Sequence, residues 1–266
     1  MIAARDRIAL PPSVERRADG VYDHVRGVTL SLNAVGAVIV DSPTPKAASR
    51  TLRLRYAVDE ERALADAIGF CAELNERLLL NVSPVRGAPA LALRWVAHLP
   101  FMLPARTLPR LPARRRHVDT SSLGSILGTG IVATLPFAVL ASLGACVVAV
   151  LVLGGLGAAS ASATLALAAA VGAGVVLHEL GHLLLLRGVP TCAVTRGARL
   201  WLLHRRLDRR REALVAAAGP TVALAIAAAL LALPGLAATV AGLALSLHAL
   251  GFTVLTADGR TLCAPR

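Results

Sequence analysis

The stretch VVLHELGHLLLLRG, from Val175 to Gly188, sets two histidines and a glutamate inside an apolar run. Because His178 and His182 are four residues apart, both imidazoles lie on one face of a helix. This HExxH spacing lets two imidazoles hold one zinc ion with Glu179 beside the open position, as in metalloproteases. The alternative is a group of polar residues satisfied inside a helix bundle. Ionisable residues within a bilayer are costly and usually functional, which favours the metal site.

That stretch lies in the apolar second half of a 266-residue chain. Apolar residues make up 56% of the sequence, more than an ordinary soluble domain holds, and long Ala, Leu, Val and Gly runs begin at Leu123. A transmembrane helix needs roughly 20 apolar residues. The segments of this length are approximately 127–153, 163–186, 213–233 and 236–256. They predict a membrane domain of four spans.

The connectors between these spans predict their orientation. The connector from Arg187 to Arg211 carries eight arginines, whereas GGLGAASAS and LPGLAAT carry no charge. Basic connectors stay in the cytoplasm, and the start of the chain, MIAARDRIALPP, lacks the apolar core of a signal peptide. We therefore expect a multi-pass protein of the cell inner (plasma) membrane with both termini in the cytoplasm.

Charge and cysteine content exclude two other classes of function. The net charge is +12, but many of the arginines lie beside the apolar runs, and the sequence holds no nucleic-acid-binding motif. We therefore expect no nucleic-acid partner. The four cysteines are scattered without a CxxC spacing, which indicates neither a disulfide framework nor a thiolate zinc site.

A third metal ligand is expected from another span at the same depth. Asp258, in FTVLTADGR, is the only carboxylate from Ala213 to the C-terminus, and the predicted topology places it level with the histidines. Its oxygen would complete a His₂-carboxylate zinc site with one open position. A turn-forming Asp-Gly after a helix is an equally good explanation of the local sequence. His248 lies ten residues earlier on the same span, and we predict a bundle-interior histidine away from the metal.

The third span begins EALVAAAGPTVAL, with Ala218, Gly219 and Pro220 near the same membrane face. Small residues there allow close helix approach, and Pro220 is expected to kink the helix. In order and in depth, HELGH, AAGP and ADGR resemble the site-2 protease family of intramembrane zinc metalloproteases, the M50 peptidases, over about residues 163–262.

This resemblance implies a role for each matching residue. The implied zinc ligands are His178, His182 and Asp258, with Glu179 as the catalytic base and acid. Gly219 and Pro220 are the implied substrate-binding positions. Ala223 stands where many members carry an asparagine after the Gly-Pro, so the substrate-ordering role of that amide is not expected here.

The N-terminal half is predicted to be a small packed module. GVYDHV and GVTLSL indicate two short strands, NAVGAVIVDS a short helix opened by Asn33, and VDEERALADAIGFCAELNERLLL a longer helix with one apolar stripe. GVTLSLNAVGAVIVD and ALADAIGFCAELNERLLL resemble the PqqD-like domain, the recognition element for leader peptides of ribosomally made, modified peptides. The resemblance spans about residues 8–82 and implies that a leader adds as a strand at the sheet edge. The Arg-rich segment TPKAASRTLRLRY favours an acidic leader or is a solvated face.

Together these patterns predict an α+β chain, with a small winged-helix-like N-terminal domain followed by a polytopic α-helical membrane domain of about four transmembrane helices. The expected divisions are peptide recognition over 1–83, a Pro/Arg-rich juxtamembrane linker over 84–122, and the metallopeptidase over 123–266. Within the linker, LALRWVAHLPFML is an expected interfacial stretch, with the linker arginines near anionic headgroups.

The expected function is an intramembrane Zn²⁺ protease that cleaves a leader or membrane-associated peptide during maturation of a ribosomal peptide. Its expected partners are the precursor or leader peptide and the bilayer, with modifying enzymes and a peptide exporter beside them. Two alternatives stay open: a regulatory site-2 protease that cuts a membrane-bound signalling protein, and a non-catalytic membrane adaptor for peptide export.

Overall fold

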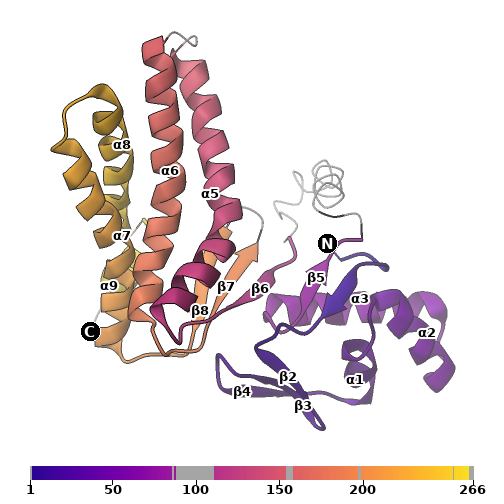
Figure 1. Cartoon of the computed structure of the whole chain (residues 1–266). Helices are drawn as coiled ribbons and strands as arrows, with labels where there is room; N and C mark the ends of the chain where they lie inside the picture. The colour runs from indigo at the N-terminus through magenta and orange to yellow at the C-terminus, as the bar shows by residue number, and fades with distance from the viewer. Residues whose placement is uncertain are drawn as a thin grey trace. The chain divides into compact units, whose positions relative to one another are not determined.

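The computed structural model describes residues 2–85, 87, 111–153, 158–196, 199–253 and 255–263. The chain mixes helices and small sheets and divides into two compact units. Unit 1 comprises residues 1–117 and 192–203, and unit 2 comprises residues 118–191 and 204–266. Figure 1 draws both units, which are described separately below.

Unit 1 opens with short antiparallel strands. Strand β1 (Arg7–Ala9) pairs with β5 (Asn81–Ser83). A three-stranded meander follows β1 in the order β2-β3-β4, formed by Val14–Arg17, Gly20–Asp23 and Val28–Ser31. The two predicted strands are confirmed as β3 and β4, whereas β1 and β2 had no clear alternating pattern in the sequence.

Three helices complete this part of unit 1, and capping side chains define where each begins. Helix α1 (Ala34–Val40) has Asn33 as N-cap, which confirms the predicted start of the short helix. Helices α2 (Pro45–Tyr56) and α3 (Glu60–Glu76) are capped by Thr44 and Asp59. These side chains accept hydrogen bonds from backbone N–H groups that the first helical turn leaves without partners.

The core of unit 1 forms where these helices meet the strands. The apolar stripe predicted for the longer helix consists of Leu64, Ala67, Ile68, Cys71, Leu74 and Leu78. Ala67, Cys71 and Leu74 are buried, whereas the other three are half-buried and Leu78 lies beyond the end of α3. The three buried residues pack in one cluster with residues from β3 and α1, such as Val21 and Ile39. Burial of this cluster holds the β2-β3-β4 sheet and the helices together as one module.

A third sheet joins segments that lie far apart in the sequence. Its strands, in the order β6-β7-β8, are Arg114–Val118, Thr191–Arg196 and Arg199–His204. The Arg187–Arg211 connector was predicted only as a cytoplasmic loop, but it contains two of these strands. The stretch LALRWVAHLPFML lies outside the described residues.

The expectation that the linker arginines lie near lipid headgroups is wrong for Arg115. Its side chain is 1% exposed, and it makes two hydrogen bonds to the carboxylate of Asp23, at 2.6 and 2.8 Å. The Asp23 carboxylate is fully buried as well. Arg115 is therefore part of the interior of unit 1, where a paired charge can be accommodated.

Unit 2 is built from long apolar helices. Figure 1 shows α5 (Leu123–Leu153) and α6 (Ala158–Leu185) running side by side, with α7 (Arg209–Leu231) next in the chain. Three helices are long and apolar enough to cross a membrane: Leu123–Val152, Ala161–Leu185 and Arg209–Leu231. Their outer faces carry exposed leucines and valines, for example Leu151 and Val152 at 76%. These three helices cover the first three predicted spans.

The fourth predicted span is not one continuous helix. Helix α8 (Leu236–Ser246) continues into the 3₁₀ helix η1 (Leu247–Phe252), and the short helix α9 (Ala257–Cys263) follows after a break. The two parts are bent by 42°, so they make a fourth span only if the bent pair is counted as one. This change of direction decides where Asp258 lies relative to His248.

Candidate metal centre

The two histidines of HELGH and the aspartate of ADGR lie together within unit 2. His178 Nε2 is 3.1 Å from His182 Nε2 and 3.0 Å from Asp258 Oδ2, and His182 Nε2 is 3.5 Å from the same oxygen. Among the residues that the structure describes, this is the one group of three His, Cys, Asp or Glu side chains close enough to hold a metal ion. Eighty residues of sequence separate His178 from Asp258, so only the tertiary fold brings them together.

The spacing of these three atoms matches a tetrahedral zinc site. Bonds of about 2.0–2.1 Å to a tetrahedral zinc place its ligand atoms about 3.3–3.4 Å apart. The three separations here run from 3.0 to 3.5 Å. Two imidazole nitrogens and one carboxylate oxygen are also a donor set that catalytic zinc sites use, with a fourth position left open. The residues present therefore fit Zn²⁺.

The backbone of α7 orients His182. His182 Nδ1 lies 2.6 Å from the carbonyl oxygen of Val215, and a carbonyl can only accept, so Nδ1 carries the proton. The proton-free Nε2 then points toward His178 and Asp258. A metal-binding histidine is usually oriented in this way by a hydrogen bond from its other nitrogen.

Glycines allow α6 and α7 to approach closely at the cluster. A Cβ on Gly219 would lie 2.5 Å from His182 Nε2, and one on Gly181 would lie 2.7 Å from the Ala218 carbonyl oxygen. Gly219 therefore clears the space in which the His182 ring lies. Pro220 is buried on α7 and packs against Gly251 of η1. A Cβ at Gly251 would lie 2.8 Å from Pro220 Cβ, so a larger residue does not fit there. Gly219 thus packs against a metal-binding histidine, whereas Pro220 packs against η1.

Glu179 adjoins the cluster from the same turn of α6. It interacts electrostatically with His182, His178 and Asp258. A carboxylate at this place can accept a proton from a water molecule held at the open position. The side chains of His182 and Asp258 are 9% and 24% exposed, so the cluster is enclosed without being sealed.

The prediction that His248 lies away from the metal ligands is wrong. In a straight α-helix ten residues span about 15 Å, but η1 and the bend before α9 bring both His248 and Asp258 to His178. His248 Nδ1 is 3.1 Å from His178 Nδ1. The spacing in the sequence held no sign of this contact; the one available signal was an ionisable residue within a membrane span.

The four cysteines do not join this cluster. Cys71 and Cys192 are buried in unit 1, and burial raises the pKa of the Cys71 thiol to about 12. Cys192 Sγ donates to Ser13 Oγ at 3.2 Å. A thiol that stays protonated at neutral pH is a poor metal ligand and nucleophile.

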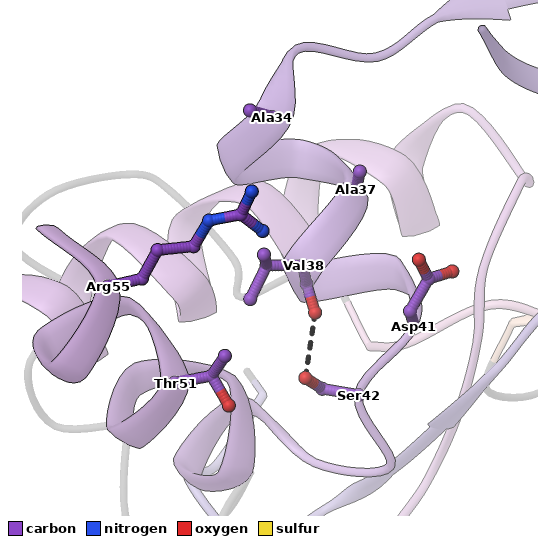
Figure 2. A pocket seen from close by; sticks show the side chains of 7 residues that line it. All are labelled: Ala34, Ala37, Val38, Asp41, Ser42, Thr51 and Arg55. Carbon is purple, nitrogen blue, oxygen red and sulfur yellow. Dashed lines mark hydrogen bonds between the residues drawn. The ribbon is translucent and has the colours of Figure 1, made fainter. Parts of the chain in front are cut away.

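Two grooves in the described part of unit 1 lie beside α1. One, of about 410 Å³, lies between α1 and α2, and Figure 2 shows the Arg55 side chain extending from α2 toward Val38. The other, of about 400 Å³, lies between α1 and α3 and is lined by the side chains of Asp66, Phe70 and Glu73 among others. The lining of this second groove includes Asn33, the N-cap of α1, two residues after β4 ends at Ser31. The groove therefore offers an acidic and aromatic surface between α1 and α3.

No family model, no curated protein and no solved structure matches the chain.

Proposed function

We propose that this protein is an intramembrane zinc metalloprotease whose centre is formed by His178, His182 and Asp258. One observation carries the proposal: two imidazole nitrogens and a carboxylate oxygen lie 3.0–3.5 Å apart, with Glu179 beside them. Placing ionisable groups of this kind together on apolar helices costs free energy, and such groups are usually kept for a function. The resemblance of HELGH, AAGP and ADGR to the site-2 protease motifs supports the same reading.

The proposed reaction is hydrolysis of a peptide bond. Bound Zn²⁺ would supply an acidified water and polarise the substrate carbonyl. Glu179 accepts the proton of the attacking water and later delivers it to the leaving amine. His178, His182 and Asp258 hold the metal, and Val215 keeps His182 in the required tautomer. Gly219 and Pro220 keep α7 close to the histidines.

The depth of the cluster favours access for water. His182 lies three residues before α6 ends at Leu185, which is about 4.5 Å along the helix axis. On α7, Val215 lies six residues after the start at Arg209, or about 9 Å. Both distances are measured to the end of the helix that adjoins the Arg-rich connector, the C-terminal end of α6 and the N-terminal end of α7. A water path from that side is therefore short compared with the ~30 Å hydrocarbon layer.

For the substrate, we propose a leader or membrane-associated peptide that unit 1 captures. Strand β4 is an outer strand of its sheet, so its edge offers backbone groups for strand addition, and the groove between α1 and α3 offers Phe70 and two carboxylates for side chains. Edge strand and neighbouring helix are the two elements that leader recognition by strand addition uses. Asp66 and Glu73 favour a basic side chain in this groove, whereas exposed arginines of α2 favour acidic residues beyond it.

The zinc site and the chemistry are tested by separating metal content from turnover. Glu179→Gln keeps size and polarity but cannot accept the proton, so cleavage should fall by a factor on the order of 10² to 10⁴ with zinc still bound. Asp258→Ala or His182→Ala should lose zinc, because each removes a metal ligand. The measurement is elemental analysis beside cleavage of a precursor peptide in detergent or liposomes. Full cleavage by Glu179→Gln would contradict the protease mechanism.

The same variants distinguish the two alternatives. An adaptor for peptide export should bind its peptide and function equally well with Glu179→Gln. A regulatory protease should cleave a membrane-bound signalling protein and ignore a leader peptide. If unit 1 captures a leader, the full-length chain should bind it with a Kd of micromolar or better, about −8 kcal/mol. A matched scrambled leader is the control, and equal binding of both would contradict leader capture.

A further inference from the structure

We propose that His248 is a positioning residue for the zinc ligand His178, and this inference rests on the proposed zinc site. The two Nδ1 atoms lie 3.1 Å apart, a hydrogen-bond distance at which only one of them can carry the proton. The rings are tilted by 33° with centroids 5.0 Å apart, so they meet through these nitrogens.

The role of each nitrogen follows from the metal site. A neutral histidine that presents Nε2 to a metal keeps its proton on Nδ1. His178 therefore donates from Nδ1, and His248 Nδ1 accepts, with its own proton on Nε2. This bond holds the His178 ring so that Nε2 faces His182 and Asp258. It corresponds to the Val215 carbonyl that orients His182, so each of the two histidine ligands has its own acceptor.

Gly174 of α6 makes this arrangement possible. A Cβ at this position would lie 2.7 Å from His248 Nε2 and 3.0 Å from the Leu245 side chain. The His248 ring is therefore seated against the α6 backbone, one turn before His178. The ring can lie there only because Gly174 has no side chain. The bend after η1 then brings Asp258 to Nε2 of His178, whereas His248 contacts Nδ1 of the same ring.

The test measures zinc affinity of the full-length protein in detergent by competition with a chromophoric chelator. His248→Leu keeps a similar volume without the acceptor and should weaken zinc binding about 10- to 100-fold, the usual effect of removing such a partner. His248→Asn restores an acceptor, because its oxygen branches from Cγ as Nδ1 does, and should bind zinc within about threefold of the unchanged protein.

A second variant changes the position of the His248 ring and leaves the residue itself unchanged. Gly174→Ala should displace the ring and weaken zinc binding, although alanine is the better helix former. The matched control is Gly144→Ala on α5, where a Cβ meets nothing within 4 Å; this change should leave zinc affinity unaltered. Leu245→Ala controls for lost packing, and should lower the melting temperature without weakening zinc binding. Gly174→Ala combined with His248→Leu should weaken binding no more than His248→Leu alone.

Three results would overturn the inference while the zinc site stands: unchanged affinity in His248→Leu, failure of His248→Asn to restore it, or complete zinc loss equal to that of His178→Ala. The last result would make His248 a ligand. If the unchanged protein takes up no zinc that depends on His178, the proposed function fails together with this inference. Cobalt substitution adds a readout independent of activity, since the absorption spectrum of bound Co²⁺ should change in His248→Leu and return in His248→Asn.

Discussion

At the scale of single residues, the absence of a side chain is as important to the site as the ligands are. Gly219 and Gly174 each clear the space for one histidine ring, His182 and His248 respectively. Neither glycine has a backbone conformation that demands glycine, since both lie within α-helices. Glycine is required at these two positions because a neighbouring helix approaches closely, and only a small residue permits that approach.

Gly219→Ala is therefore expected to damage the metal site although it favours the helix. Its Cβ would meet His182 Nε2 at 2.5 Å, so the ring must leave the position from which it faces Asp258. We expect zinc affinity to fall at least tenfold and stability to fall by about 1–3 kcal/mol, as for other overpacked sites. Chelator competition and thermal unfolding measure the two effects. Gly128→Ala, in open space on α5, is the control, and equal zinc affinity in both variants would contradict the model of the site.

At the scale of elements, the ion pair of Asp23 and Arg115 fastens β6 to the β2-β3-β4 sheet of unit 1. Burial alone raises the pKa of Asp23, but hydrogen bonds and charge from Arg115, with a smaller effect of Arg26, outweigh it and hold this pKa below its ordinary value. Both side chains are almost fully buried. Removing one charge would leave the other buried without its partner, which is strongly destabilising.

Asp23→Asn should therefore lower the stability of unit 1 by about 3–5 kcal/mol. Trp201 lies on β8, so its fluorescence in a Trp95→Phe background follows the unfolding of this unit in the full-length chain. The control is Glu60→Gln, which removes a half-exposed pair with Arg53 and should cost less than about 1 kcal/mol. Equal effects of the two changes would contradict a structural role for the buried pair.

The same pair predicts how stability depends on pH. Because the folded pKa of Asp23 is lowered, the pair stabilises unit 1 fully above the unfolded value of about 3.9 and loses this contribution as the pH falls through the folded pKa. The unfolding midpoint of the unchanged protein should fall more steeply than that of Asp23→Asn as the medium is acidified below about pH 4. Parallel curves for the two proteins would contradict the assignment.

At the scale of the whole molecule, one sheet constrains the membrane topology. Strand β6 precedes α5, and β7 follows α6, yet the two strands are neighbours in the sheet β6-β7-β8. Arg196 of β7 also pairs with Glu76 of α3 at 3.2 Å. Strands of one sheet must lie on the same side of a membrane, so if α5 and α6 cross a membrane, they must cross it out and back. This supports a connector on the same side as the N-terminal residues.

Cysteine labelling tests this topology, with the four native cysteines replaced by alanine. We expect an impermeant reagent added outside intact cells to label a single cysteine at Ser160, between the first two spans, and to leave one at Arg206 unlabelled. Permeabilised cells, in which both positions should react, are the control. Labelling of Arg206→Cys alone would place the metal centre near the outer face and contradict the proposed orientation.

Much of this protein follows from the sequence by itself. Span length and apolar runs indicated the three long helices, and the four-residue spacing placed His178 and His182 on one face of α6. Capping residues such as Asn33 marked where helices begin. These features depend on neighbours within one or two helical turns, so the local sequence contains the information that determines them.

The remaining features depend on segments distant in the chain, and only the tertiary structure decided them. Strands β6, β7 and β8 carry no clear alternation, because their pairing rather than their pattern makes them strands. The burial of Arg115 depends on Asp23, 92 residues away. His248 and Asp258 can both reach His178 because the chain bends between them, after η1, whereas a continuous helix would have set them about 15 Å apart. Contacts of this kind depend on which surfaces pack together, and a local sequence pattern does not contain that information.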